Sequence, residues 1–108
     1  MKLFLALVAS LSLAATAKPY ETLAGKKFGG RSCTDHNIAT VPCPSDGSVG
    51  TAVCDLIANC NAVIYNSNEN TCYTYNMPSQ EFEGCKTDGA THTQVQLSST
   101  CRPQRRSP

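Results

Sequence analysis

The sequence has no tryptophan and three phenylalanines, and aromatic residues make up only 6% of its 108 residues. It also lacks a C-x-x-C pair, which argues against zinc ribbons and thioredoxin-like redox chemistry, and it lacks an N-x-[ST] glycosylation sequon. Beyond the N-terminal segment, no apolar run approaches the roughly 20 residues that a membrane-spanning helix needs. Such a chain can bury only a small core and needs cross-links to be stable.

A strong excess of either charge is missing too, since nine Lys and Arg face eight Asp and Glu. The distribution is uneven: residues 18–32 hold four basic and one acidic side chain, residues 33–101 hold one basic and seven acidic, and residues 102–108 hold three arginines. An acidic body repels a phosphate backbone, so nucleic acid is not an expected partner.

The N-terminal segment has the pattern of a secretory signal. Lys2 precedes an apolar run over residues 3–15, and Ala15-Thr16-Ala17 fits an A-x-A cleavage site. We therefore expect a secreted, extracellular protein without a membrane span. The expected organisation is a signal peptide at 1–17, a flexible leader at 18–32, a cysteine-rich domain at 33–101 and a disordered basic tail at 102–108. Within the leader, Lys26-Lys27 is interpreted as a solvated charge pair, with a dibasic processing site as the alternative.

Cysteine is the abundant residue, with seven in a small chain. In an exported protein this density predicts a disulfide framework. Each bridge typically contributes about 2–4 kcal/mol to stability, against about 5–15 kcal/mol for a whole domain. The odd number leaves one cysteine unpaired, or joined to a second chain in a disulfide-linked dimer. The seven are Cys33, Cys43, Cys54, Cys60, Cys72, Cys85 and Cys101.

A helix is predicted to end near Cys60. Asp46 or Ser48 can cap its start, and Asn59 can end it because asparagine tolerates a left-handed conformation. The predicted helix has one apolar stripe at helical spacing, which is expected to face the core and to direct Cys54 and Cys60 toward it. The stripe consists of Val49, Ala52, Val53, Leu56 and Ile57.

A β-hairpin is predicted to follow the helix. Residues 62–65 form an apolar, β-branched run, residues 66–70 are turn formers, and residues 72–77 alternate as a second strand. Further strands are expected at 38–41 and at 93–97, the latter with Val95 and Leu97 inward, after a turn at Asp88-Gly89. The expected fold is a small disulfide-rich α+β domain, with one helix packed on an antiparallel sheet of about four strands.

The pattern Cys60-Asn61-Ala62-Val63-Ile64-Tyr65-Asn66, followed by Cys72-Tyr73-Thr74-Tyr75, resembles the centre of the PAN/apple module over residues 48–77. That family staples a helix to a hairpin by disulfides. Its helix commonly carries two cysteines, whereas Gly50 stands where the first would be. The resemblance therefore implies a partner for one hairpin cysteine in Cys43 or Cys85, and its apple type implies a Cys33–Cys101 bridge.

The resemblance also implies a function. PAN/apple modules are non-catalytic and bind proteins or carbohydrates outside the cell, and small secreted copies in plant-associated pathogens act as adhesins, elicitors or virulence effectors. The alternative is a Kazal-like serine-protease inhibitor. Its core is similar to Cys43-Pro44-Ser45-Asp46-Gly47 followed by Cys54, Leu56, Ala58 and Cys60, and its reactive loop would lie between Cys33 and Cys43.

No catalytic, cofactor or metal site is predicted. His36 and His92 each lie in polar sequence, and they could bind a metal with Asp35 only if the fold gathered them. Glu81 and Glu83 are interpreted as a solvated acidic loop rather than an acid–base pair. We therefore expect a protein that is not an enzyme.

A binding surface is predicted on the hairpin. Tyrosine supplies rigid apolar area and asparagine supplies adaptable hydrogen bonds, a combination that suits contact with sugars or proteins. Tyr65 is expected in the core instead. The candidate binding residues are Tyr73, Tyr75, Asn66, Asn68 and Asn70.

Overall fold

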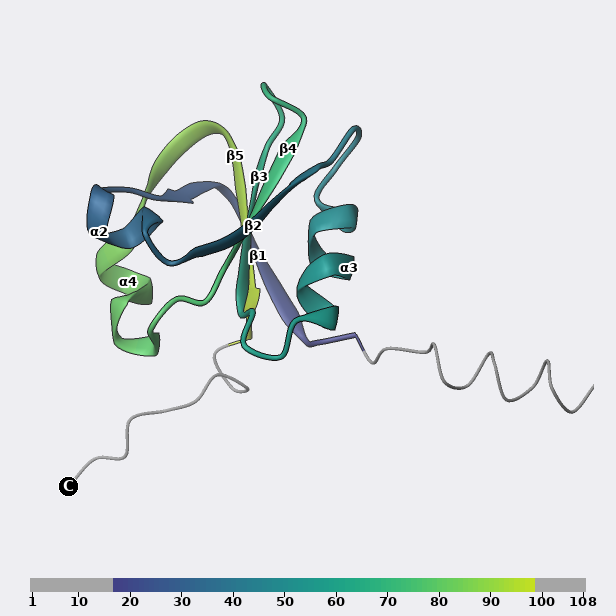
Figure 1. Ribbon diagram of the computed structural model, residues 1–108. Helices are drawn as coiled ribbons and strands as arrows, with labels where there is room; N and C mark the ends of the chain where they lie inside the picture. The colour runs from purple at the N-terminus through teal and green to yellow at the C-terminus, as the bar shows by residue number, and fades with distance from the viewer. Residues whose placement is uncertain (1–16, 99–108) are drawn as a thin grey trace, which may run out of the picture.

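A computed structural model describes residues 17–98 of the chain. Five antiparallel strands form one sheet in the order β1-β5-β3-β4-β2, with helix α3 on one face and helices α2 and α4 on the other (Figure 1). The elements are β1 (Tyr20–Phe28), α2 (Arg31–Thr34), β2 (Asn37–Pro42), α3 (Ser48–Leu56), β3 (Ala62–Asn66), β4 (Thr71–Tyr75), η1 (Ser79–Glu81), α4 (Phe82–Cys85) and β5 (Lys86–Leu97). The expected signal peptide up to residue 16, the expected tail at 102–108 and Cys101 lie outside the described residues.

The small disulfide-rich α+β class is confirmed, and so is the predicted hairpin. Strands β3 and β4 pair from Ala62↔Tyr75 to Asn66↔Thr71. Asn70 takes a left-handed conformation with φ of 52°, as the turn chemistry of asparagine allows. The hairpin lies inside the sheet because β3 also pairs with β5, and β4 with β2. The described helices include none that is long and apolar enough to cross a membrane.

Helix α3 lies where it was predicted, but its buried side differs from the predicted stripe. Leu56 is 72% exposed and Val49 is 42% exposed, while Gly50 and Cys54 are buried. A Cβ atom at Gly50 would lie 2.7 Å from Cys72 Cβ and from Val63 Cγ1. The helix backbone therefore lies directly on β3 and β4, and this explains why no cysteine could replace Gly50.

The two ends of α3 also differ in detail from the prediction. The residue before the helix is Gly47, and Asp46 Oδ1 accepts a hydrogen bond from the Ser48 N–H at 2.9 Å. The helix ends at Leu56, because Ile57 is already extended. Asn59 is not the left-handed residue that was expected, since Asn70 is the only non-glycine residue with positive φ among residues 17–98.

The segment 18–32, expected to be a flexible leader, supplies strand β1 instead. β1 pairs with β5 from Tyr20↔Leu97 to Phe28↔Lys86, and Phe28 is buried. The prediction failed because β1 has no clean alternation of apolar and polar residues. Its strand pairing makes the sheet five-stranded, and it places the Lys26-Lys27 dibasic pair within the sheet.

Strand β5 is longer than predicted and includes Asp88 and Gly89, which were expected to turn. The excess length is taken up by a register shift opposite Gly25, whose φ is 75°. The prediction that Val95 and Leu97 point inward is confirmed for Val95, which packs against the buried cluster beneath α3, but the opposite face of β5 is the more deeply buried one. Both are half-buried, while Gln94 and Gln96 are fully buried.

The burial of these two glutamines follows from the position of β5. Both faces of the strand are covered, since Val95 packs against the buried cluster that includes Cys54 and Val63 while Gln94 and Gln96 are buried on the other face, so alternation no longer separates inside from outside. Gln94 pairs with Ile64 and Gln96 with Ala62 on β3. Their amides are joined by a hydrogen bond, and Gln96 Nε2 donates to Glu21 Oε2 at 2.6 Å. The network supplies partners for both amide nitrogens and for Gln96 Oε1, whereas Gln94 Oε1 has no hydrogen-bond partner among the described residues.

Three disulfides hold the described domain together: Cys33–Cys85, Cys43–Cys72 and Cys54–Cys60. Cys72 pairs with Cys43, one of the two partners implied for a hairpin cysteine. The implied Cys33–Cys101 bridge is wrong, because α2 and α4 lie on the same face of the sheet and bring Cys33 to Cys85. Cys101 is therefore the odd cysteine.

The core divides between the two faces of the sheet. On the side of α2 and α4, Phe28 packs edge-on against Tyr75 at 5.0 Å and against Phe82 at 6.0 Å between ring centroids. We call this side the aromatic face; its buried residues are Phe28, Cys33, Ala62, Ile64, Tyr75, Met77, Phe82 and Cys85. The other side, the α3 face, buries Cys43, Cys54, Cys60, Val63 and Cys72.

Candidate functional site

A hollow of about 380 Å³ opens on the aromatic face beside the hairpin. Residues of all five strands, of helix α2 and of the β3–β4 turn contribute to its wall. It is lined by Lys27, Phe28, Thr34, Asn37, Ile64, Asn66, Glu69, Tyr73, Tyr75 and His92.

The floor of the hollow is apolar and rigid. Phe28, Ile64 and Tyr75 are buried core residues. Burial raises the pKa of the Tyr75 hydroxyl above its usual value, and the neighbouring Tyr73 adds to the shift. A floor built from core side chains is held in place by packing, so the shape of the hollow is preformed.

Tyr73 forms one wall with a half-buried ring. Its hydroxyl donates a hydrogen bond to Glu69 Oε1 at 2.6 Å, and this bond raises the pKa of Tyr73, with a smaller contribution from burial. The bond joins β4 to the turn that precedes it. It therefore fixes the direction of the ring while leaving part of its face accessible.

His92 and Lys27 add polar groups to the opposite wall. His92 lies on β5 across from Asn66, and burial lowers its pKa, aided by the charge of Lys27 and opposed by that of Glu69. His92 Nδ1 is buried without a hydrogen-bond partner among the described residues. Lys27 takes part in none of the ion pairs found across residues 17–98. The Lys27 ammonium is therefore available to a ligand, whereas His92 Nδ1 is enclosed by the protein, since a Cβ atom at Gly89 would lie 2.7 Å from it.

The predicted binding residues are divided by the fold. Tyr73, Tyr75 and Asn66 line the hollow, whereas Asn68 and Asn70 do not. Asn66 is also a turn former, since its Oδ1 accepts from the Asn68 N–H at 2.9 Å and from Thr91 Oγ1 at 3.3 Å. The Asn70 carbonyl accepts from the Cys43 N–H at 2.9 Å, which ties the turn to the segment before α3.

Sequence reasoning missed Lys27, Glu69 and His92 as members of this site. Lys27 was assigned to a leader, and His92 to a polar loop, because the long β1–β5 pairing was not predicted. The available signal was the length of the polar segment between Cys85 and Leu97, which suits a long central strand once β1 is recognised.

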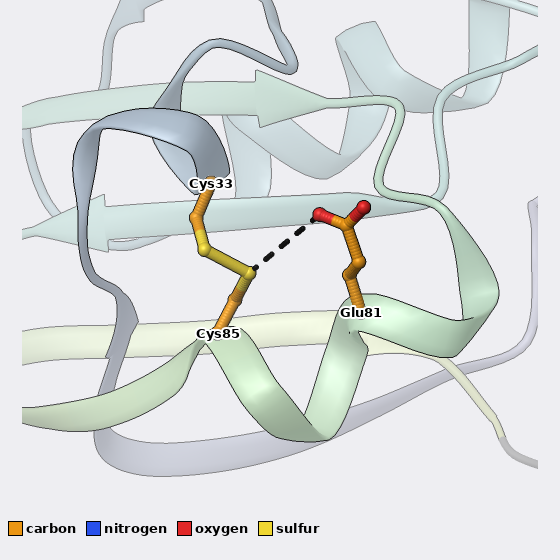
Figure 2. A group of neighbouring side chains, drawn as sticks. All are labelled: Cys33, Glu81 and Cys85. Carbon is orange, nitrogen blue, oxygen red and sulfur yellow. Dashed lines mark hydrogen bonds between the residues drawn. A yellow bond between two sulfur atoms is a disulfide. The ribbon is translucent and has the colours of Figure 1, made fainter.

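A second cluster joins Cys33, Glu81 and Cys85, whose sulfur and oxygen atoms lie within 4.8 Å of one another (Figure 2). Cys33 and Cys85 form a disulfide, so neither offers the thiolate that binds a metal. Glu81 Oε1 lies 4.0 Å from Cys85 Sγ. Because a disulfide sulfur carries no hydrogen, this is a packing contact.

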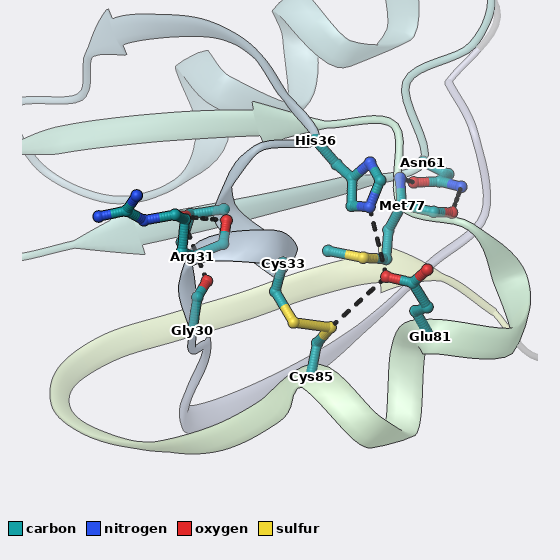
Figure 3. Close-up of polar contacts among 9 residues, drawn as sticks. Gly30, Arg31, Cys33, His36, Asn61, Met77, Glu81 and Cys85 are labelled. Atoms are coloured by element: carbon teal, nitrogen blue, oxygen red, sulfur yellow. Dashed lines mark hydrogen bonds and ion pairs between the residues drawn. A yellow bond between two sulfur atoms is a disulfide. The ribbon is translucent and has the colours of Figure 1, made fainter.

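The same glutamate binds His36, whose Nε2 lies 3.3 Å from Glu81 Oε1 (Figure 3). Next to it, Asn61 Nδ2 donates to the Met77 carbonyl at 2.8 Å, and the Met77 N–H donates back to Asn61 Oδ1 at 2.9 Å. These contacts connect η1 to the core of the sheet. Within residues 17–98 they do not gather Asp35, His36 and His92 into a metal-binding group.

The acidic loop that was expected at 78–89 is helical in η1 and α4, and its last residues begin strand β5. Glu83 forms an ion pair with Lys86 at 2.8 Å, whereas Glu81 contacts His36. The two carboxylates thus have separate partners and different surroundings, which is not the shared site that a catalytic pair of carboxylates needs.

The alternative hypothesis, a Kazal-like inhibitor, predicted a reactive loop between Cys33 and Cys43. This segment contains α2 and then β2, which pairs with β4 from Asn37↔Tyr75 to Pro42↔Thr71. An edge strand that is hydrogen-bonded along its length does not have the shape of a protruding loop. Of the two bridges expected for such an inhibitor, Cys43–Cys72 is present, but Cys33–Cys60 is not, because Cys33 pairs with Cys85 and Cys60 with Cys54.

No family model, curated protein or solved structure matches this chain. The likeness of residues 48–77 to the PAN/apple module therefore stays a resemblance of pattern. The case for a function depends on the residues of the hollow.

Proposed function

We propose that the protein is a secreted, non-enzymatic module that binds an extracellular glycan through the hollow on the aromatic face. One observation supports this most: the accessible ring of Tyr73 stands beside an apolar floor, with amide, imidazole, ammonium and carboxylate groups around it. In a plant-associated pathogen, such a module would act as an adhesin, elicitor or effector.

The chemistry of the wall suits a sugar. An aromatic ring packs against the C–H face of a sugar ring, while polar side chains exchange hydrogen bonds with its hydroxyl groups. The Lys27 ammonium takes part in none of the ion pairs found across residues 17–98, and its strand β1 is separated from the Tyr73 strand β4 by β5 and β3. A sugar bound between Lys27 and Tyr73 would contact both walls.

The size of the site favours a glycan over a protein partner. A stable protein interface buries about 800 Å² on each side, and it needs an extended surface. The hollow, at about 380 Å³, falls within the range of roughly 300–1,000 Å³ that is usual for small-ligand sites. It therefore accommodates one or two sugar rings at the end or along the edge of a polysaccharide.

A glycan array of neutral and acidic oligosaccharides, followed by titration calorimetry on any ligand found, tests the proposal. Tyr73→Ala should weaken binding by about tenfold or more, because a buried aromatic contact contributes about 1–3 kcal/mol. The control is Tyr65→Ala, since Tyr65 lines a separate hollow of about 360 Å³ next to α3. Loss of binding with Tyr65→Ala but not with Tyr73→Ala would place the site on the α3 face. Protein ligands but no glycans would contradict the proposal.

A further inference from the structure

Lys18, just before β1, contacts the end of α3 through both of its nitrogen atoms. Its side-chain Nζ lies 2.9 Å from the Cys54 carbonyl, 2.8 Å from that of Ile57 and 2.9 Å from that of Cys60. Its main-chain nitrogen donates to Asp55 Oδ1 at 3.0 Å. The start of the domain is thus anchored at two points on one helix end.

The side-chain contact has a clear physical reason. Of the three carbonyls, that of Cys54 belongs to the last turn of α3, that of Ile57 to its C-cap and that of Cys60 to the turn that follows. The end of a helix carries the negative end of its dipole, which favours a cation there. An ammonium has three hydrogens, and here each has its own carbonyl acceptor. Lys18 therefore acts as the cap of α3, which has no basic residue in its own last turn.

The main-chain contact leaves a charge without a counter-ion. Asp55 is half-buried, and its Oδ1 also accepts a hydrogen bond from the Tyr20 hydroxyl at 2.7 Å. Both donors to Oδ1 are neutral as long as the Lys18 nitrogen is part of a peptide bond. Asp55 takes part in none of the ion pairs found within residues 17–98.

Lys18 is also the residue that follows Ala15-Thr16-Ala17, the A-x-A pattern of a cleavage site. We propose that hydrolysis of the Ala17–Lys18 peptide bond converts the Lys18 main-chain nitrogen into an α-ammonium that forms an ion pair with Asp55. Water adds its hydroxyl to the Ala17 carbonyl carbon and a hydrogen to the Lys18 nitrogen, which then takes a proton from solvent. A signal-type peptidase is the catalyst.

Removal of the signal peptide then strengthens the contact between Lys18 and Asp55, because the new charge replaces a neutral donor at the same place. A charge-assisted hydrogen bond is stronger than the neutral bond it replaces. The inference depends on the export step of the proposed function and is independent of the glycan. It also assigns Asp55 a role that its sequence position, on a polar side of the helix, did not suggest.

The test has two parts, and the first is the mass of the N-terminal peptide of the protein secreted by a eukaryotic host. The proposal expects a chain that begins at Lys18. A chain that begins at another residue, or one that stays in the cell with its signal peptide attached, would overturn the proposal.

The second part is a thermodynamic cycle on refolded, oxidised protein, which requires neither export nor a ligand. Chains 18–108 and 17–108 are compared, each with and without Asp55→Asn. In the chain that begins at Lys18, Asp55→Asn should lower the folding equilibrium constant about threefold to tenfold more than it does in the chain that keeps Ala17. An equal effect in both chains would overturn the proposal. Asp46→Asn, at an exposed carboxylate before α3, is the control and should have the same effect in both.

Discussion

The two faces of the sheet are filled in different ways. The aromatic face is built from rings, with Phe28 between Tyr75 and Phe82, and a single disulfide joins its two short helices. The α3 face has two disulfides and small side chains, and its helix packs on the sheet through Gly50. Each face has a hollow, of about 380 Å³ beside Tyr73 and of about 360 Å³ beside α3, but only the first has a floor of buried aromatic side chains. The hollow that carries the proposed function accordingly lies on the aromatic face.

This difference separates two tasks within one small domain. The α3 face holds the sheet to its longest helix and anchors the start of the chain through Lys18. The aromatic face combines packing with an accessible wall. We therefore expect substitutions on the α3 face to act on stability, and those around Tyr73 to act mainly on binding.

The largest expected effect is the loss of stability when a disulfide is removed, and this loss should differ between the two faces. Cys33–Cys85 spans 52 residues and Cys54–Cys60 spans 6. Because a longer closed loop restricts the unfolded chain more, Cys33→Ser with Cys85→Ser should lower the free energy of unfolding by about 4 kcal/mol, and the Cys54 and Cys60 pair of substitutions by about 2 kcal/mol. Urea denaturation measures both, in a Cys101→Ser background that prevents exchange. Equal losses of unfolding free energy for the two disulfides would mean that the length of the closed loop does not determine how much each one stabilises the domain.

The second-largest expected loss of stability is that of Gly50→Ala, on the α3 face. The added methyl group would lie 2.7 Å from Cys72 Cβ and Val63 Cγ1, and such overpacking costs about 1–3 kcal/mol. Gly84→Ala on α4 is the matched control, since nothing lies within 4 Å of its added Cβ. The control should be neutral, or stabilising by up to about 1 kcal/mol, because alanine favours a helix. Similar losses in both variants would show that the helix backbone does not lie as close to β3 and β4 as the geometry indicates.

The smallest expected effect is a pH dependence on the aromatic face. Burial, with a contribution from Lys27, lowers the pKa of His92 in the folded protein. The unfolded chain therefore takes up the proton more readily, so stability should fall as pH decreases below about 6.5, the ordinary pKa of histidine. His92→Gln should reduce this acid-side loss, as measured by denaturation at pH 7.5 and pH 5. Gly50→Ala should shift stability by the same amount at both pH values. An unchanged slope in His92→Gln would contradict the expected direction.

Local sequence was sufficient where neighbouring residues alone determine structure. The β3–β4 hairpin could be predicted because its apolar run, its turn formers and its second strand lie within 14 residues, 62–75. For the same reason Tyr73, Tyr75 and Asn66 could be chosen as candidates for a site. Prediction failed for β1, whose strand pairing is with residues about 60–77 positions later, and for Leu56, whose exposure depends on how closely α3 approaches the sheet.

The sequence by itself determined that this chain is a small domain dependent on disulfides, with a hairpin after a helix, because composition and short-range patterning set those features. Only the tertiary structure decided that Cys33 meets Cys85, that Gln94 and Gln96 are buried, and that Lys27 and His92 line the same hollow as Tyr73. Each of these depends on strand order. Six cysteines allow 15 pairings, and a polar residue on a central strand is buried or exposed according to what covers it. Contacts between residues far apart in sequence are set by the packing of the whole sheet, and no local pattern encodes them.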